Sequence, residues 1–143
     1  MNPELVVKRF FKEVRSGRNI HLASELMSEK VLAHQIQSEH EVTIERSPID
    51  YANHVQEMLD TYGTFTLEVQ ELFTSQQDKV YVRWKQVGTH IGEIDEFQPT
   101  GLPVIELASA VYQVKDGKIN EYWIQIDRAG IQAQLESNKE KIK

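Results

Sequence analysis

The stretch from Tyr112 to Leu135, YQVKDGKINEYWIQIDRAGIQAQL, decides the fold of this chain. Two runs that alternate apolar and polar residues flank Asp116-Gly117, a dipeptide typical of tight β-hairpin turns. The second run ends at Asp127, and a helical pattern follows it. The stretch therefore predicts a hairpin that leads directly into a closing helix, with one carboxylate at the junction.

The turn of this hairpin decides which side chains share a face with Asp127. A three-residue loop from Lys115 to Gly117 would place Asp127 with Trp123, Gln125, Val111, Ser109 and Leu107. A two-residue turn at Asp116-Gly117 would shift the pairing by one residue, to Tyr112, Ala110 and Ala108. We prefer the three-residue loop, and Gln125 shares the Asp127 face in either case.

The alternating pattern extends upstream of the hairpin. It predicts four strands in all, over residues 65–73, 80–89, 104–114 and 118–126. The segment 91–103, IGEIDEFQPTGLP, has no regular pattern and is long enough to be a lid over whatever the sheet encloses.

Helical patterns precede the strands. Asn2-Pro3-Glu4 is a helix-start signal, and apolar residues at helical spacing follow it as far as Gly17. A short second helix is expected from Asn19 to Met27, and residues 31–37 are interpreted as irregular or briefly extended. Ser47-Pro48 opens a third helix that ends at Gly63.

Helices that precede a set of strands favour an α+β domain in which helices cover one face of a curved antiparallel sheet. The other face then requires a ligand pocket, a partner subunit or both. The length of 143 residues suits a single domain over residues 1–143, and the polar residues 137–143 are predicted to be a frayed tail.

Composition narrows the function classes. The chain has 16 basic and 22 acidic side chains, and its net charge of −6 disfavours nucleic acid and anionic membranes as partners. It has no cysteine, which excludes disulfides and thiolate chemistry. The first residues lack the apolar core of a secretion signal, and no segment approaches the roughly 18 apolar residues of a membrane span. We expect a cytoplasmic protein.

An ordered set of motifs runs through the second half of the chain. It consists of Val82-x-Trp84, Gly88-Thr89-His90-x-Gly92, Pro99-Thr100-Gly101, Asp116-Gly117-Lys118-Ile119, Trp123-x-x-x-Asp127, Gly130 and Gln134-Leu135. With the amino-terminal FFKEV and with Val31 to His34, this set resembles the SnoaL-like polyketide cyclases, also called ester cyclases. Each motif alone is weak evidence, whereas their order is fairly specific.

The resemblance implies the cone-shaped α+β barrel of the nuclear transport factor two superfamily, with about three amino-terminal helices on one face of the sheet and a short carboxy-terminal helix. It also implies a homodimer formed through the sheet. In the cyclases of this family, an aspartate at the position of Asp127 is the acid and base for an intramolecular aldol closure without metal or cofactor. Ala33, Leu102 and Gln113 depart from the usual Asp, basic residue and Arg, so the polarity of the substrate is open.

Residue chemistry alone gives Asp127 two roles. A carboxylate at the inner end of a sheet beside Trp123 would lose hydration, and such a group can remove a proton from an acidic C–H. An aspartate directly before Arg-Ala-Gly-Ile-Gln is also a favoured helix cap, which needs no chemistry. The resemblance favours the pocket role, and both roles can hold together.

The expected site consists of two catalytic residues, Asp127 and His90, and four substrate-binding residues, His34, Gln125, Trp84 and Trp123. The histidines could donate to an oxyanion, Gln125 could orient a carbonyl, and the tryptophans could form the cavity wall. Each also has a plain structural explanation. A metal site at His34 and His40 is disfavoured because no His-Glu-x-x-His or comparable spacing occurs.

The sequence therefore predicts cofactor-independent acid/base chemistry, namely cyclisation, isomerisation or a related lyase reaction, on a small apolar carbonyl compound in an enclosed pocket. The alternative is a non-catalytic module of the same fold that binds a small ligand or dimerises. The altered Leu102 and Gln113 add weight to this alternative.

Overall fold

The computed structural model describes residues 2–37 and 39–143. Its helices are α1 (Pro3–Phe10), α2 (Ala23–Leu26), α3 (Pro48–Tyr62) and α4 (Arg128–Lys141), with a π-helical turn at Phe11–Arg15 and a 3₁₀ turn at Ile20–Leu22. Its strands are β1 (Met27–Gln37), β2 (His40–Arg46), β3 (Thr66–Thr74), β4 (Lys79–Thr89), β5 (Pro103–Lys115) and β6 (Lys118–Ile126).

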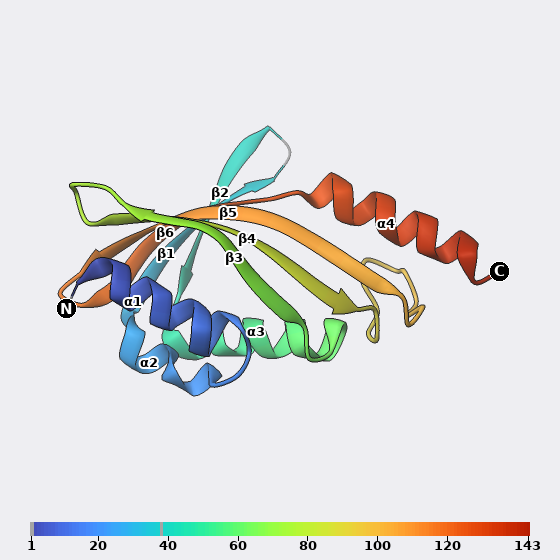
Figure 1. Cartoon of the computed structure of the whole chain (residues 1–143), viewed down its shortest axis with the longest axis horizontal. Helices are drawn as coiled ribbons and strands as arrows, with labels where there is room; N and C mark the ends of the chain where they lie inside the picture. Colours follow the sequence, from blue (N-terminus) through green and yellow to red (C-terminus); the bar gives the residue numbers. More distant parts are fainter. Residues whose placement is uncertain (1, 38) are drawn as a thin grey trace.

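The strands form one open, curved sheet in the order β2-β1-β6-β5-β4-β3, and α1, α2 and α3 lie on one of its faces (Figure 1). The predicted α+β class, with amino-terminal helices on one face of the sheet, is confirmed. The helix α4 runs beside the end of β5, on the side of the molecule opposite the amino terminus (Figure 1). None of the described helices combines the length and the apolar character that a membrane crossing requires.

Two features of the sheet differ from the prediction. The strand β2 was not predicted, and β1 was predicted only as an irregular or briefly extended passage over residues 31–37. In addition, β1 pairs with β6 in parallel, so the sheet is not antiparallel throughout. Residues 31–37 looked irregular because the apolar run Val31 to Ala33 is short, but both neighbouring strands supply backbone partners. Tertiary pairing therefore overrides a weak local preference.

The helix α4 is longer than predicted. It continues to Lys141, although a frayed tail was expected from residue 137. The reason is a tertiary contact, because Leu135 and Asn138 are buried and Asn138 Nδ2 donates a hydrogen bond to the Pro103 carbonyl at 3.0 Å.

The β5–β6 hairpin has a two-residue turn, so the preferred three-residue loop is wrong. Lys115 lies opposite Lys118, and Asp116 and Gly117 both adopt positive φ, 53° and 76°. A bulge at Asn120 then adds one residue to β6, because the pairs change from Val114–Ile119 to Gln113–Glu121. Beyond the bulge, Val111 lies opposite Trp123 and Ser109 opposite Gln125, so Trp123 and Gln125 share a face with Val111 and Ser109, as the three-residue loop predicted.

The inner face of the sheet carries the core. In β4 and β5 the even-numbered residues other than Glu106 are buried, including Val82, Trp84, Ala108, Ala110 and Tyr112. Phe11 packs its ring 5.1 Å from that of Trp84 and 5.6 Å from that of Tyr112. Even-numbered positions of these strands therefore face the helices, and odd-numbered positions form the outer face.

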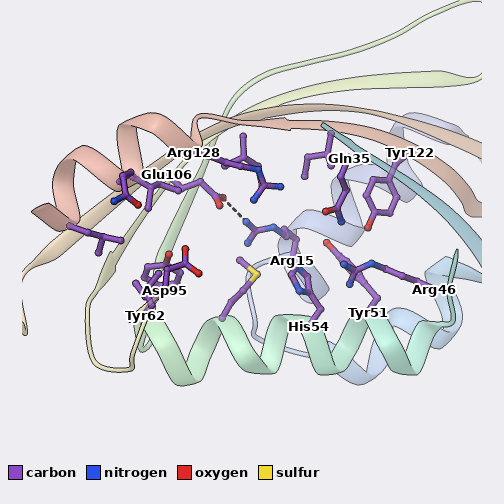
Figure 2. Close-up of a pocket in the computed structure, with 17 residues that line it drawn as sticks. Arg15, Gln35, Arg46, Tyr51, His54, Tyr62, Asp95, Glu106, Tyr122 and Arg128 are labelled. Atoms are coloured by element: carbon purple, nitrogen blue, oxygen red, sulfur yellow. Dashed lines mark hydrogen bonds and ion pairs between the residues drawn. The ribbon is translucent and has the colours of Figure 1, made fainter. Parts of the chain in front are cut away.

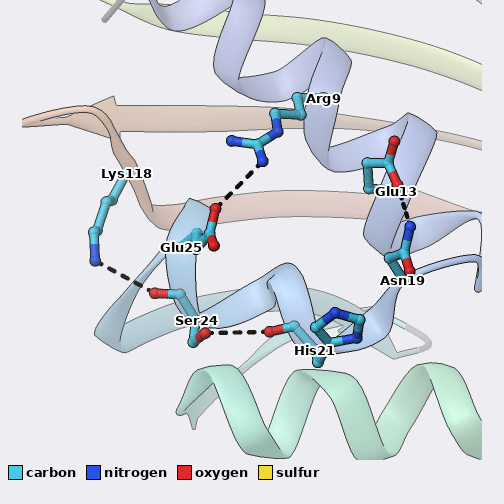
Figure 3. Close-up of polar contacts among 7 residues, drawn as sticks. All are labelled: Arg9, Glu13, Asn19, His21, Ser24, Glu25 and Lys118. Carbon is cyan, nitrogen blue, oxygen red and sulfur yellow. Dashed lines mark hydrogen bonds and ion pairs between the residues drawn. The ribbon is translucent and has the colours of Figure 1, made fainter.

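Polar contacts hold the helical layer in place (Figure 3). Arg9 of α1 donates to Glu25 of α2 at 3.3 Å, and Lys118 at the start of β6 donates to the Ser24 carbonyl at 3.4 Å. At the start of α3, Ser47 and Asp50 form a reciprocal capping box. These contacts tie α2 to α1 and β6 and stabilise the start of α3, which forms one wall of the cavity described next.

Candidate functional site

A cavity of about 360 Å³ lies between α3, the inner face of the sheet and the start of α4 (Figure 2). Helical spacing brings one side of α3 to its wall, with Tyr51, His54, Met58 and Tyr62. Alternate residues of β6 form the facing wall, with Tyr122, Ile124 and Ile126. The other lining residues are Arg15, Gln35, Arg46, Ile94, Asp95, Glu106, Arg128, Ile131, Gln132 and Leu135.

Glu106 places a carboxylate in this wall from the inner face of β5. Its Oε2 accepts hydrogen bonds from Arg15 Nη2 at 2.8 Å and from Trp84 Nε1 at 3.2 Å. The side chain is 12% exposed, and its Oε1 receives no hydrogen bond from any residue that the structure describes. One oxygen is thus anchored and the other is free to act on a ligand.

Arg15 holds Glu106 in position. The Arg15 side chain is 5% exposed, and its Nη1 donates to Gln86 Oε1 at 2.8 Å. Its guanidinium also lies over the rings of Trp84 and Phe65, with 5.5 and 5.7 Å to the centroids. Charge-assisted hydrogen bonds and ring contacts together fix the plane of the guanidinium, and with it the carboxylate.

His54 provides an uncharged imidazole on the α3 side of the cavity. Burial lowers its pKa to about 4, with the positive charges of Arg46 and Arg15 acting in the same direction. At neutral pH the ring is therefore neutral, and it can donate one hydrogen bond and accept another.

The cavity tyrosines are hydrogen-bond donors at neutral pH. Burial raises the pKa of Tyr51 and of Tyr122, and burial with the nearby charges of Glu106 and Asp95 raises the pKa of Tyr62. Each phenol therefore keeps its proton. Such donors suit a developing negative charge on a carbonyl oxygen.

The six residues predicted to form the site do not line this cavity. His34, Trp123 and Gln125 lie together on the outer face of the sheet, in a hollow of about 270 Å³. The His34 ring stacks on Trp123 at 5.2 Å, and its two nitrogens lie 2.9 Å from Thr43 Oγ1 and 2.5 Å from Glu121 Oε2. Protein groups therefore occupy both nitrogens of His34.

The expectation that Asp127 is buried at the floor of the pocket is wrong. Its side chain is exposed, and Oδ1 accepts a hydrogen bond from the Gly130 amide at 2.9 Å as the cap of α4. With Gln125 it borders a shallow depression on the outer face. The reason is parity, because residues 123, 125 and 127 of this strand all point away from the helices.

Trp84 and His90 lie in the interior. Trp84 is fully buried beneath the cavity wall, where it supports Glu106. His90 is also fully buried, and neither ring nitrogen has a hydrogen-bond partner in the described structure. Its backbone pairs with Leu102 and Gly101, which ties the end of β4 to the 91–103 loop. Catalytic or binding roles for these residues stay predictions.

The sequence analysis missed Glu106, Arg15 and His54. A signal for Glu106 existed, because it shares its alternation with Val104, Ala108 and Ala110 on β5 and so faces inward. No comparable local signal marks Arg15 or His54. Within residues 2–37 and 39–143, no three His, Cys, Asp or Glu side chains are grouped so that they could hold a metal ion.

Comparison with known families gives one match, the SnoaL-like polyketide cyclase family, over residues 5–135. No curated protein sequence matches the chain. Solved structures with the same fold include a protein from Acidithiobacillus ferrooxidans provisionally named a polyketide cyclase. It has a TM-score of 0.82 and 22% identity, and the match covers 96% of each chain.

Two further structures show the range of names attached to this fold. IdmH from Streptomyces antibioticus, also provisionally named a polyketide cyclase, has a TM-score of 0.78 and 22% identity, over 95% of this chain and 99% of that one. AclR from Streptomyces galilaeus, provisionally named a hydroxylase, has a TM-score of 0.73 and 22% identity, over 94% of this chain and 83% of that one. At this identity the likeness establishes the fold, and the reaction must be argued from the site.

Proposed function

The chain belongs to the SnoaL-like polyketide cyclase family, and from this premise we propose that its inner cavity performs cofactor-independent acid/base chemistry on a small carbonyl compound. The reaction class is cyclisation or isomerisation through an enolate. The observation that carries the proposal is the placement of Glu106, a largely buried carboxylate with one free oxygen, on a wall shared with Ile124 and Ile126.

In this proposal Glu106 is the base. Its carboxylate takes a proton from the carbon next to the substrate carbonyl, and the electron pair of the broken C–H bond moves onto the carbonyl oxygen. A protonated tyrosine, Tyr51 or Tyr122, donates a hydrogen bond to the resulting enolate. These groups need no cofactor.

The enolate then has two outcomes. In an isomerisation, the Glu106 carboxyl returns the proton to another carbon of the enolate system. In a cyclisation, the enolate carbon attacks a second carbonyl of the same molecule and forms a C–C bond, and the new alkoxide takes the proton from Glu106. The apolar wall limits access of water, which would otherwise compete for these protons.

Asp95 is the other carboxylate at this cavity, and it is a weaker candidate. It lies on the exposed 91–103 loop, whereas Glu106 is fixed by two hydrogen bonds. A positioned base held by the sheet suits proton transfer better than one on an exposed loop.

Deuterium exchange tests the proposal without knowledge of the natural substrate. We expect the protein to accelerate exchange at the carbon next to the carbonyl of 1-tetralone in deuterium oxide, followed by proton NMR. Glu106→Gln preserves the size of the side chain and should lower the rate by about 100-fold or more. Binding of the ketone without any acceleration would instead support the non-catalytic ligand-binding alternative.

Two other expectations stay predictions beside this proposal. One is the homodimer through the outer face of the sheet, which exposes Phe73 and Leu107. The other is the cytoplasmic location.

A further inference from the structure

We propose that the substrate of the inner cavity carries a carboxylate in addition to its reactive carbonyl, and that Arg46 binds this carboxylate. The inference rests on the proposed function, because it concerns the substrate of the same cavity. It replaces the apolar carbonyl compound expected from the sequence with a small anionic one.

The charges that line the cavity support this substrate class. Although the chain has a net charge of −6, the cavity lining contains three arginines against two carboxylates. Arg15 is already paired with Glu106. Neither Arg46 nor Arg128 forms an ion pair with any side chain that the structure describes, so two cations face the cavity without an anion of the protein.

Arg46 is the stronger of these two cations as a ligand contact. It ends β2, and its Nε is shielded from solvent without a hydrogen-bond partner in the described structure. Leaving a donor of a charged group without an acceptor is unfavourable. An anion in the cavity would offset this deficit, and guanidinium groups match carboxylates in planar, paired hydrogen bonds.

The positive charge of Arg46 acts on the interior of the cavity. It is the first charge, after burial, among the causes that lower the pKa of His54, and the first cause that opposes the raised pKa of Tyr122. Figure 2 shows Arg46 beside Tyr51 and His54, and Arg128 pointing inward from the start of α4. A carboxylate near Arg46 would therefore lie in a favourable field.

A matched pair of probes tests the charge requirement. 3-Benzoylpropionate and its methyl ester share one aryl ketone and differ in the negative charge. By isothermal titration calorimetry at pH 7, we expect the acid to bind about tenfold or more tightly than the ester. A ligand carboxylate beside Arg46 should also raise the pKa of His54, which an NMR titration of its ring protons detects.

Variants assign the preference to Arg46. Arg46→Gln should bring the affinities for acid and ester close to equality and leave ester binding near the wild-type value. Arg46→Lys retains the charge and should retain part of the preference. Arg83→Gln removes an exposed arginine on the outer face and should change neither affinity. Circular dichroism confirms that each variant is folded.

Arg128→Gln offers a second route if Arg46→Gln does not fold, because Arg128 is exposed at the start of α4. It removes the other unpaired cation of the cavity and should weaken the acid relative to the ester, though less than Arg46→Gln.

The outcomes separate this inference from the proposed function. Equal binding of acid and ester to the wild type, or a preference that survives Arg46→Gln, would overturn the carboxylate site. If the protein exchanges the ketone protons of the ester through Glu106 but does not bind the acid, the carboxylate site is overturned and the proposed function stands. Tight, Arg46-dependent binding of the acid without exchange would overturn the proposed function alone.

Discussion

The guanidinium of Arg15 and the carboxylate of Glu106 form an ion pair in the wall of the inner cavity, with Nη2 and Oε2 2.8 Å apart. The pair joins the π-helical turn after α1 to strand β5, 91 residues further along the chain. The packing of the first helix on the sheet and the position of the proposed base therefore depend on the same contact.

Removal of one partner should destabilise the fold more than removal of both. Arg15→Met leaves Glu106 as an unpaired, largely buried charge, and we expect a loss of about 3–5 kcal/mol in the free energy of unfolding. Urea denaturation measures it. The double variant Arg15→Met/Glu106→Gln should lose less free energy of unfolding than Arg15→Met alone. Arg18→Met alters an exposed neighbour and should change the free energy of unfolding little. Equal losses in the single and double variants would argue against a buried ion pair.

His54 should make the stability depend on pH in the acidic range. Its pKa is about 4 in the folded protein, against an ordinary value of 6.5, so the unfolded chain binds the extra proton first as the pH falls. Stability should therefore be highest above pH 6.5 and decrease toward pH 4, by up to about 3 kcal/mol from this residue. His54→Gln should flatten that part of the profile, measured by urea denaturation at stepped pH. An unchanged slope would show that the imidazole is not held neutral.

Asp127 should contribute to stability as a helix cap. Asp127→Ala removes the acceptor for the Gly130 amide and should cost about 1 kcal/mol, whereas Asp127→Asn keeps a capping oxygen and should cost only a few tenths. Thermal melts of the two variants give the comparison. A loss as large for Asn as for Ala would point to a role for the charge beyond capping.

The outer face of the sheet should form the predicted homodimer interface. Phe73 and Leu107 are 57% and 44% exposed there, so Phe73→Asp or Leu107→Asp should convert a dimer to monomers, as read by light scattering after gel filtration. Ile49→Asp alters a residue that is 72% exposed at the start of α3 and serves as the control. If the wild-type protein is a monomer at micromolar concentration, the predicted homodimer is contradicted.

The sequence predicted the secondary-structure elements better than it predicted which face of the sheet each side chain occupies. Strong caps and alternation located α3, β4, β5 and β6 close to their observed bounds. The shared face of Val111 and Trp123 was predicted from the wrong turn, because a bulge at Asn120 cannot be recognised from local pattern. β1 was predicted only as an irregular or briefly extended passage, because its strand character comes from pairing with β2 and β6.

The site was the least predictable part for a related reason. The preferred register places Asp127 and Glu106 on opposite faces of the sheet, but it does not state which face the helices cover. Because Asp127 matches the catalytic aspartate of the family, the predicted site was centred on a residue that lies on the outer face. Arg15 and His54 became site residues only when the π-helical turn and α3 were placed against the sheet.

Side-by-side exchange rates for Glu106→Gln and Asp127→Asn test the central claim most directly. With 1-tetralone in deuterium oxide, we predict that Glu106→Gln lowers the protein-dependent rate by about 100-fold or more and that Asp127→Asn leaves it within about twofold of wild type. The reverse result, a rate lost with Asp127→Asn and retained with Glu106→Gln, would contradict the assignment of the base to the inner cavity.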